Sequence, residues 1–339
     1  MANPTVVATL RGDMLESWHR AALAVKDARG QTIFSFGDIE RPIFPRSAVK
    51  ALQAIALVER GGFTRYDFTD AELALACASH NSEAVHADAA LSMLHKLDLG
   101  EAALACGPHV SLLEKEAHVM LRSGSTPGPR HNNCSGKHAA MLALADLLGA
   151  PVQGYEQVDH PVQVTIREVL SEMVGIELDP SRAGIDGCSV PSYPIPLASL
   201  AFGFARFGTG EGLSPLRERS VAKIRAVCAA HPYMVAGRER FCTEVMQRFG
   251  RRVFVKTGAE GVFCAAFPEQ GFGAALKVDD GAGRASEALM ARLIAAVIGA
   301  NRDEEAFLDR WSDRPVRNWA GIETGRVRML SDVFSDWPN

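Results

Sequence analysis

The sequence predicts an α+β fold in which an antiparallel sheet is completed by both ends of the chain and encloses a helical region. Three observations support this prediction: strand-like segments near the N-terminus, helical periodicity through the middle, and alternation of polar and apolar residues at 326–329. The 339 residues, 47% of them hydrophobic, suffice for one large core or two small ones. Without a repeat or a linker-like segment, we expect one domain over 1–339, with a helical subregion at about 60–230.

The N-terminal part of the chain predicts sheet. Residues 6–10, 21–25 and 31–36 are short apolar or alternating segments, and the turn-forming sequence Asp27-Ala28-Arg29-Gly30 separates the last two. We therefore expect an antiparallel meander at the start of the chain.

A helix is predicted next, over residues 47–59. Prolines precede it, Gly61 and Gly62 end it, and its apolar residues recur at helical spacing. These apolar residues are Val49, Ala51, Leu52, Ile55 and Ala56.

The remaining elements follow the same criteria of periodicity and length. Further helices are predicted at 70–78, 83–97, 137–148, 161–174, 220–230 and 285–298, and further strands at 253–256, 273–278 and 326–329. The last of these strands would close the sheet that the N-terminus begins.

Composition excludes several classes of function. The net charge of -4 and the absence of a long Lys/Arg run disfavour nucleic acid as a partner. No secretory signal is recognisable, and the most apolar late segment, 289–300, is too short for a membrane span of about 20 residues. Seven scattered cysteines indicate buried thiols, not a disulfide framework. We therefore expect a cytoplasmic protein that does not bind membranes.

The first candidate for chemistry is Ser47 with Lys50. Three residues apart on a helix, the two side chains share a face, so a deprotonated amine could activate the hydroxyl as a nucleophile. The spacing alone is weak, because Ser220 and Lys223 repeat it on a helix that we expect to be solvated. A helix start with a solvated lysine is the alternative.

Two later motifs strengthen this interpretation by their order. Ser79-His80-Asn81 and then Lys256-Thr257-Gly258 follow the Ser-x-x-Lys motif, a series similar to that of serine β-lactamases and penicillin-binding proteins. Ser79 could relay protons to a leaving group, and Lys256 could bind a substrate carboxylate or keep a neighbouring amine neutral. A helix-end cap and a solvated strand end are the alternatives for these two residues.

Two polar, glycine-containing loops form a third candidate. In the segment 131–138, Cys134 and Lys137 could face one pocket, where Asp186 and Cys188 of the segment 184–191 could meet them. Structural zinc sites usually show paired short spacings such as Cys-x-x-Cys, so spacing alone favours inert buried thiols.

Together these segments resemble the rhizobial-type L-asparaginases, the asparaginase II family. The resemblance rests on residues 46–50, 77–81, 131–138, 186–188 and 256–261, and the segment around Cys134 is its most specific part. It implies a fold similar to serine β-lactamases and glutaminases, a homodimer, and hydrolysis of asparagine to aspartate and ammonia. It also implies two serine-lysine pairs, Ser47 with Lys50 and Ser79 with Lys256, and a zinc ion bound by Cys134, Lys137 and Cys188.

Within this interpretation, Ser47 attacks the side-chain amide and forms an acyl-enzyme that water hydrolyses, although Ser79 could attack first. Asp186 would orient Lys137, and we expect His138 and Arg46 beside the metal ligands or in the substrate pocket. Zinc would shape that pocket and not activate water.

Three alternatives stay open. A β-lactamase or transpeptidase would need an export signal, and a non-catalytic zinc-binding or amino-acid-binding protein would not need the complete serine-lysine set. Glutamine is a possible substrate, because one methylene changes selectivity by only about 1 to 3 kcal/mol.

Overall fold

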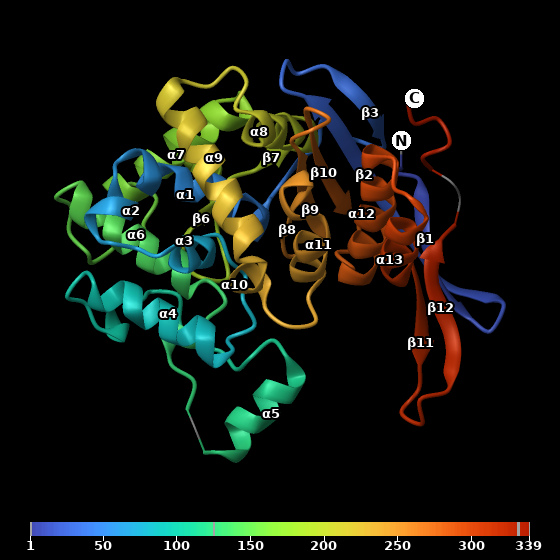
Figure 1. The fold of residues 1–339 in the computed structure, drawn as a ribbon, viewed down its shortest axis with the longest axis horizontal. Coiled ribbons are helices and arrows are strands. Elements are labelled where there is room, and N and C mark those ends of the chain that lie inside the picture. Colours follow the sequence, from blue (N-terminus) through green and yellow to red (C-terminus); the bar gives the residue numbers. More distant parts are fainter. Residues whose placement is uncertain (1, 125, 331–332, 339) are drawn as a thin grey trace. The chain divides into compact units, whose positions relative to one another are not determined.

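The computed structural model describes residues 2–124, 126–330 and 333–338, which form two compact units (Figure 1). Unit 1 comprises Met1–Ala48, Ile195–Thr209 and Val255–Asn339, and unit 2 comprises Val49–Pro194 and Gly210–Phe254. That the two units act as a single domain stays a prediction.

Unit 1 is built on an eight-stranded sheet with the order β11-β12-β1-β2-β10-β9-β8, and β3 pairs with β2. Its strands are β1 (Thr5–Arg11), β2 (Met14–Asp27), β3 (Thr32–Phe36), β8 (Phe254–Thr257), β9 (Val262–Phe267), β10 (Phe272–Val278), β11 (Asp313–Arg317) and β12 (Glu323–Met329). The N-terminal strand lies between β12 and β2, with Val7 opposite Met329 on one side and His19 on the other. The predicted α+β class, with an antiparallel sheet completed by both termini, is therefore confirmed.

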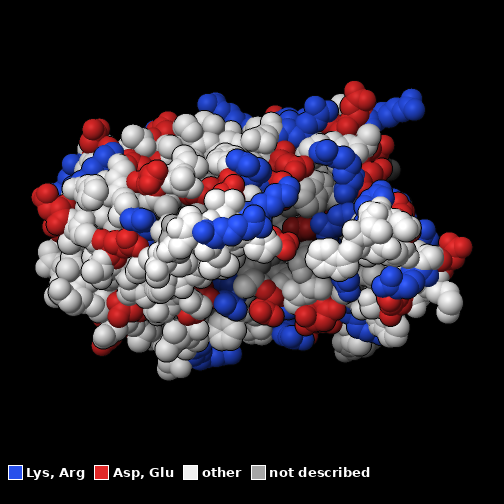
Figure 2. All heavy atoms as spheres, turned by 90° about the horizontal axis from the view of Figure 1, so that it is seen from below, with Lys and Arg blue, Asp and Glu red and all other residues white. Residues whose placement is uncertain are grey.

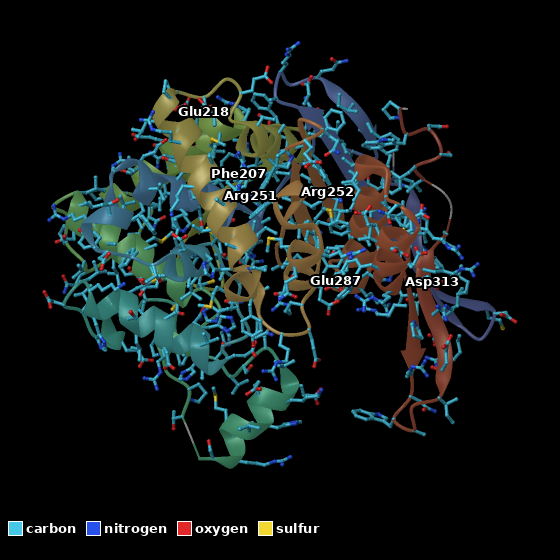
Figure 3. All side chains as sticks on the ribbon, viewed as in Figure 1. Phe207, Glu218, Arg251, Arg252, Glu287 and Asp313 are labelled. Atoms are coloured by element: carbon cyan, nitrogen blue, oxygen red, sulfur yellow. The ribbon has the colours of Figure 1, made fainter. Side chains whose placement is uncertain are left out.

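Three helices pack on this sheet: α8 (Leu197–Thr209), α12 (Gly283–Ile298) and α13 (Arg302–Ser312). Helix α8 approaches β10 so closely that a Cβ at Gly273 would lie 2.0 Å from the Ala205 nitrogen, which explains the glycine. An ion pair of 3.4 Å between Arg314 and Glu287 joins β11 to α12. Figure 3 labels Glu287 and also Asp313, where β11 begins. A short ladder of β4 (Pro42–Ile43) and β7 (Ile195–Pro196) completes the unit.

Unit 2 is mainly helical. Its helices are α1 (Lys50–Glu59), α2 (Gly62–Arg65), α3 (Asp70–Ala76), α4 (Ala84–His95), α5 (Glu114–Arg122), α6 (Ser135–Leu147), α7 (Pro161–Val174), α9 (Pro215–Ala230), α10 (Pro232–Ala236) and α11 (Phe241–Phe249). Helix α1 packs against α6, α7 and α9, and α3 packs against α6. Short 3-10 turns and the hairpin of β5 (Gly184–Ile185) and β6 (Pro191–Ser192) connect the helices.

Local chemistry explains where helix starts differ from the predictions. Helix α9 begins at Pro215, five residues before its predicted start, because Ser214 caps it and a proline suits the first helical position. The segment predicted as one helix from residue 47 starts as a 3-10 turn, η1 (Arg46–Val49), and becomes α-helical at Lys50.

The sequence analysis overlooked β9 and α8. All six residues of β9 are buried, so the strand lacks the alternation by which half-buried strands are recognised. Conversely, the first half of β2 is largely exposed, and only its buried part, at 21–25, was predicted.

Two surface and hydropathy features can be described for this chain. Acidic and basic side chains are interspersed on the face drawn in Figure 2. Among the described residues, no helix combines the length and the hydropathy needed to span a bilayer.

Candidate functional site

The ε-amine of Lys50 lies in a buried polar site of unit 2. Lys50 is the first residue of α1 and is 1% exposed. Its Nζ lies 2.5 Å from the Ala78 carbonyl oxygen, 3.0 Å from Ser79 Oγ and 3.4 Å from the Asn133 carbonyl oxygen. The structure thus pairs Lys50 with Ser79, a pairing that the three-residue spacing did not predict.

Ser79 is held by the backbone around it. Helix α3 ends with Cys77 at its C-cap, and Ser79 follows two residues later, nearly fully buried. The Ser79 N–H donates to the Val235 carbonyl at 3.0 Å, and Arg240 donates to the Ser79 carbonyl at 3.4 Å. Because its backbone is fixed on both sides, the Ser79 hydroxyl has a defined position opposite Lys50.

The other predicted serine-lysine residues belong to unit 1. Ser47 lies in the 3-10 turn η1 and is partly exposed, and Lys256 is buried in β8, where its Nζ donates to the Thr257 carbonyl at 2.9 Å. Arg46 adopts a left-handed φ of 52°, which is uncommon for a residue other than glycine. The pairs Ser47 with Lys50 and Ser79 with Lys256, each joining residues of different units, stay predictions, as does a pocket role for Arg46.

A second site in unit 2 brings together Cys134, Lys137 and Cys188, which we call the thiol cluster. Lys137 Nζ donates to Cys188 Sγ at 2.9 Å, and Cys134 Sγ donates to Asn133 Oδ1 at 3.2 Å and also interacts with Cys188. All three residues are at most 4% exposed. The two loops that the sequence analysis singled out therefore meet, although they lie about 50 residues apart.

The electrostatics of the thiol cluster favour one thiolate. The hydrogen bond from Cys188 holds the pKa of Cys134 well below its usual value, helped by the charges of Lys50 and Lys137 and opposed by burial. The same hydrogen bond, together with burial, raises the pKa of Cys188. Burial lowers the pKa of Lys137, but the charges of Cys188 and Cys134 outweigh it and raise that pKa overall. Of the two thiols, Cys134 is therefore the one that gives up its proton more readily.

The donor set of the thiol cluster fits zinc. Thiolates are preferred zinc ligands, and a deprotonated lysine amine would add a nitrogen ligand. Among the described residues, no group of three or more His, Cys, Asp and Glu could hold a metal ion, so a metal here would require Lys137 as a ligand. Asp186 Oδ2 lies 3.9 Å from Cys188 Sγ, and its charge also favours the charged form of Lys137.

Asn132 fixes the loop that carries Cys134, a role that the sequence analysis missed. Its Oδ1 accepts from the Cys134 N–H at 2.9 Å, and its Nδ2 donates to the carbonyls of Cys106 and Gly107 at 2.8 and 2.9 Å. Short asparagine side chains often bond to the backbone two residues on, and this property was the available signal.

His138 lies behind the thiol cluster, fully buried. The Ala105 N–H donates to the Tyr155 hydroxyl at 2.9 Å, so the hydroxyl hydrogen is available to His138 Nδ1 at 2.6 Å. Burial, followed by the charges of Lys137 and Lys50, holds the pKa of His138 well below its usual value. His138 is therefore a neutral ring oriented by Tyr155, a residue to which the sequence analysis assigned no role.

The hairpin of β5 and β6 presents Cys188 through a tight turn. Asp186 N–H donates to the Val190 carbonyl at 2.9 Å, and Ser189 N–H donates back to the Asp186 carbonyl at 2.9 Å. Ser189 adopts a left-handed φ of 77°, and its hydroxyl anchors the turn to the Ala105 carbonyl at 3.0 Å. The turn is thus tied to the segment that supports Tyr155.

Comparisons with known proteins place this chain in context. A family model described as L-asparaginase II matches residues 7–329. A search of curated protein sequences gives no match.

Solved structures with partial similarity include a crystal structure of Mglu in its native form, at 14% identity and a TM-score of 0.47, covering 83% of this chain and 65% of Mglu. A β-lactamase from Mycobacterium bovis matches at 15% identity and a TM-score of 0.40, covering 78% and 88% of the two chains. An octameric penicillin-binding protein homologue from Pyrococcus abyssi matches at 13% identity and a TM-score of 0.36, covering 93% and 84%. This chain thus spans about two thirds of the length of Mglu.

Proposed function

Because the chain belongs to the L-asparaginase II family and is therefore an amidohydrolase, we propose that it hydrolyses L-asparagine to L-aspartate and ammonia through a serine-lysine nucleophile. The observation that supports this chemistry is the buried contact of 3.0 Å between Lys50 Nζ and Ser79 Oγ. A serine hydroxyl is a weak nucleophile until a base removes its proton, and a buried amine in contact with it can be that base.

To act as the base, Lys50 must react in its neutral form. A neutral amine has two N–H groups and one lone pair, whereas an ammonium has three N–H groups and no acceptor. The carbonyls of Ala78 and Asn133 can take the two N–H groups, which leaves the lone pair for the Ser79 O–H. In this arrangement Lys50 accepts the serine proton without losing its other hydrogen bonds.

In the proposed reaction, a serine oxygen attacks the side-chain amide carbon and its proton passes to Lys50. The C–N bond then breaks, the nitrogen takes up a proton and leaves as ammonia, and water hydrolyses the acyl ester to aspartate. Two assignments are tested below: Ser47 attacks while Ser79 relays the proton, or Ser79 attacks directly.

We further propose that Cys134, Lys137 and Cys188 hold a zinc ion. When bound, zinc would supply a Lewis-acidic positive charge at the edge of the substrate pocket. The chain's own contribution is to present two sulfur atoms and one nitrogen from rigid segments, with Asn132 fixing Cys134 and the hairpin turn fixing Cys188. A homodimer is proposed on the family resemblance alone, and a cytoplasmic location stays an expectation of the sequence analysis.

The decisive experiment measures ammonia release from asparagine and from glutamine by the wild-type protein and by Ser47→Ala and Ser79→Ala. The attacking serine is identified by a variant that forms no acyl-enzyme in rapid-quench mass spectrometry, whereas a relay variant slows both steps without abolishing acylation. Absence of turnover of asparagine by wild type contradicts the proposed substrate, and normal turnover in both variants contradicts the serine mechanism.

A further inference from the structure

A buried imidazole outside the proposed chemistry, His80, joins the segment that carries Ser79 to the loop that carries Cys134. His80 is fully buried and directly follows Ser79. Its backbone N–H donates to the Asn133 carbonyl at 3.3 Å, and its ring Nε2 lies 2.9 Å from Ser135 Oγ. One residue thus contacts both neighbours of Cys134.

Hydrogen bonding fixes the tautomer of the His80 ring. The Ser82 N–H donates to Nδ1 at 3.1 Å, so Nδ1 is an acceptor and the ring proton is on Nε2. Nε2–H therefore donates to Ser135 Oγ. Burial, followed by the nearby His86 ring and Lys50, holds the pKa of His80 well below its usual value, which keeps this neutral tautomer.

Stacking fixes the plane of the same ring. The His86 ring stacks on His80 with centroids 5.0 Å apart and planes 12° apart, and the Tyr233 ring stacks on His86 at 5.5 Å and 11°. His86 Nε2 is anchored in turn on the Tyr233 carbonyl at 3.0 Å. The direction of the His80 donor is therefore set by its surroundings.

The acceptor of this bond lies at a position that controls the thiol cluster. Ser135 is the first residue of α6, directly after Cys134 and two residues before Lys137. A hydrogen bond from Ser82 Oγ to the His131 carbonyl runs alongside and ties the same two segments together. Holding Ser135 thus holds the start of the helix that supplies two of the three proposed ligands.

We propose that His80 is a positioning residue that sets the Ser79–Lys50 pair and the thiol cluster relative to each other within unit 2. It contacts neither a ligand sulfur nor a serine hydroxyl of the proposed reaction, yet zinc affinity and turnover both depend on it. This proposal rests on the proposed function for its kinetic readout and on the proposed zinc site for its binding readout.

The experiment compares His80→Asn with His80→Gln. An asparagine carbonyl can replace Nδ1 as the acceptor for Ser82 N–H but cannot reach Ser135, whereas a glutamine amide can reach Ser135 as a donor. His19→Asn is the matched control, because it removes another buried imidazole, in unit 1, that contacts Asp280. Zinc affinity is measured by competition with a chromophoric chelator, and kcat and KM by ammonia release.

We expect His80→Asn to weaken zinc binding about 10- to 100-fold and to lower kcat with little change in KM, as for other residues that support metal ligands. His80→Gln restores most of both losses, and His19→Asn changes neither. Adding Ser135→Ala to His80→Asn should cause no further loss of zinc affinity or kcat, because the hydrogen bond between His80 and Ser135 is already absent. The proposal is overturned if His80→Asn and His80→Gln lose zinc affinity and kcat equally. It is also overturned if His80→Asn has the same zinc affinity and kcat as His19→Asn.

Failure of the proposed function is distinguishable from failure of this proposal. A wild-type protein that binds zinc without turning over asparagine contradicts the proposed function, and the zinc comparison still decides the role of His80. If wild type turns over asparagine without binding zinc, the comparison of kcat between His80→Asn and His80→Gln decides the role of His80. If wild type does neither, amide hydrogen exchange at residues 132–136 decides it: faster exchange in His80→Asn than in His80→Gln supports the proposal, and equal exchange overturns it.

Discussion

Lys50 and Lys137 are both buried lysines in the first turn of a helix of unit 2, yet their partners differ. Lys50 Nζ contacts the oxygen atoms of Ala78 and Ser79, whereas Lys137 Nζ donates to the sulfur of Cys188; the charges of both lysines act on Cys134. An amine in contact with a serine hydroxyl can take up the proton of that hydroxyl. An amine that donates to a sulfur atom can become a metal ligand once it loses its proton. Burial alone therefore does not define the role of a lysine; the hydrogen-bond acceptors around its amine define that role.

The two sites share Cys134. The charges of Lys50 and Lys137 both help to hold the pKa of Cys134 below its usual value, after the hydrogen bond from Cys188. The proposed base and the proposed metal ligand therefore compete electrostatically for one thiolate. Experiments that separate the two lysines test this comparison directly.

The largest effect is expected from Lys50→Met beside Lys137→Met. Removing the base should lower kcat about 10²- to 10⁴-fold while zinc remains bound, because general-base catalysis contributes that much. Lys137→Met should remove zinc and raise KM, with a smaller loss of kcat. Ammonia release and metal content by mass spectrometry measure both, and a larger kcat loss in Lys137→Met would reverse the assigned roles.

The pH dependence of zinc binding should reveal which groups hold protons in the metal-free cluster. Hydrogen bonding and burial raise the pKa of Cys188, and the neighbouring charges raise that of Lys137, whereas the pKa of Cys134 lies below its usual value, so Cys188 and Lys137 keep their protons to higher pH than Cys134. Zinc binding should then release about two protons, and affinity should rise about 100-fold per pH unit. Competition titrations across neutral pH measure this slope; release of one proton or none would contradict the assignment of Lys137 as a ligand.

The sequence was sufficient for the fold class because apolar periodicity survives wherever one face of an element is exposed. Closure of the sheet by residues 326–329 followed from alternation, and the structure pairs this segment with β1. Continuous burial erased the same signal in β9, and ten of the thirteen residues of α8 are buried as well. Those elements are defined by their tertiary neighbours, which no local pattern encodes.

For the candidate site, loop composition predicted one meeting of residues, and the family resemblance predicted their role. Cys134, Lys137 and Cys188 do meet, as the two polar loops indicated, but their spacing alone favoured inert thiols, and a zinc site was implied only by the resemblance. The contact of Lys50 with Ser79 spans 29 positions and depends on where α3 ends, which helical spacing cannot reveal. Tyr155 went unnoticed because a buried tyrosine has no distinctive sequence context.

The charges of both lysines act on Cys134, and Asn132 holds Cys134 in place, so a variant at Asn132 tests the importance of that position. Asn132→Asp keeps the shape but turns a carboxylate toward two carbonyl oxygens, so it should lower the free energy of unfolding by about 1 to 3 kcal/mol and weaken zinc binding. Asn318→Asp is the matched control, because Asn318 is exposed and its side-chain Oδ1 accepts hydrogen bonds from the Ala320 and Ile322 N–H groups, as a carboxylate also would. This control should change stability by less than about 0.5 kcal/mol. Urea denaturation measures the stability and chelator competition measures the zinc affinity. Equal stability of the two variants would contradict the proposed role of Asn132 in holding Cys134.

The smallest effect is expected at Tyr155, which contacts His138 behind the thiol cluster. Tyr155→Phe removes the hydroxyl that links the Ala105 N–H to His138 Nδ1, and leaving these buried groups unpaired should cost about 1 to 2 kcal/mol of unfolding free energy. Zinc affinity should fall, because the Cys188 turn is anchored on the same segment through Ser189. The proton transfer at Lys50 involves neither group, so kcat at saturating asparagine should stay close to that of wild type. A variant with unchanged zinc affinity and reduced kcat would show that Tyr155 and His138 support Lys50 instead.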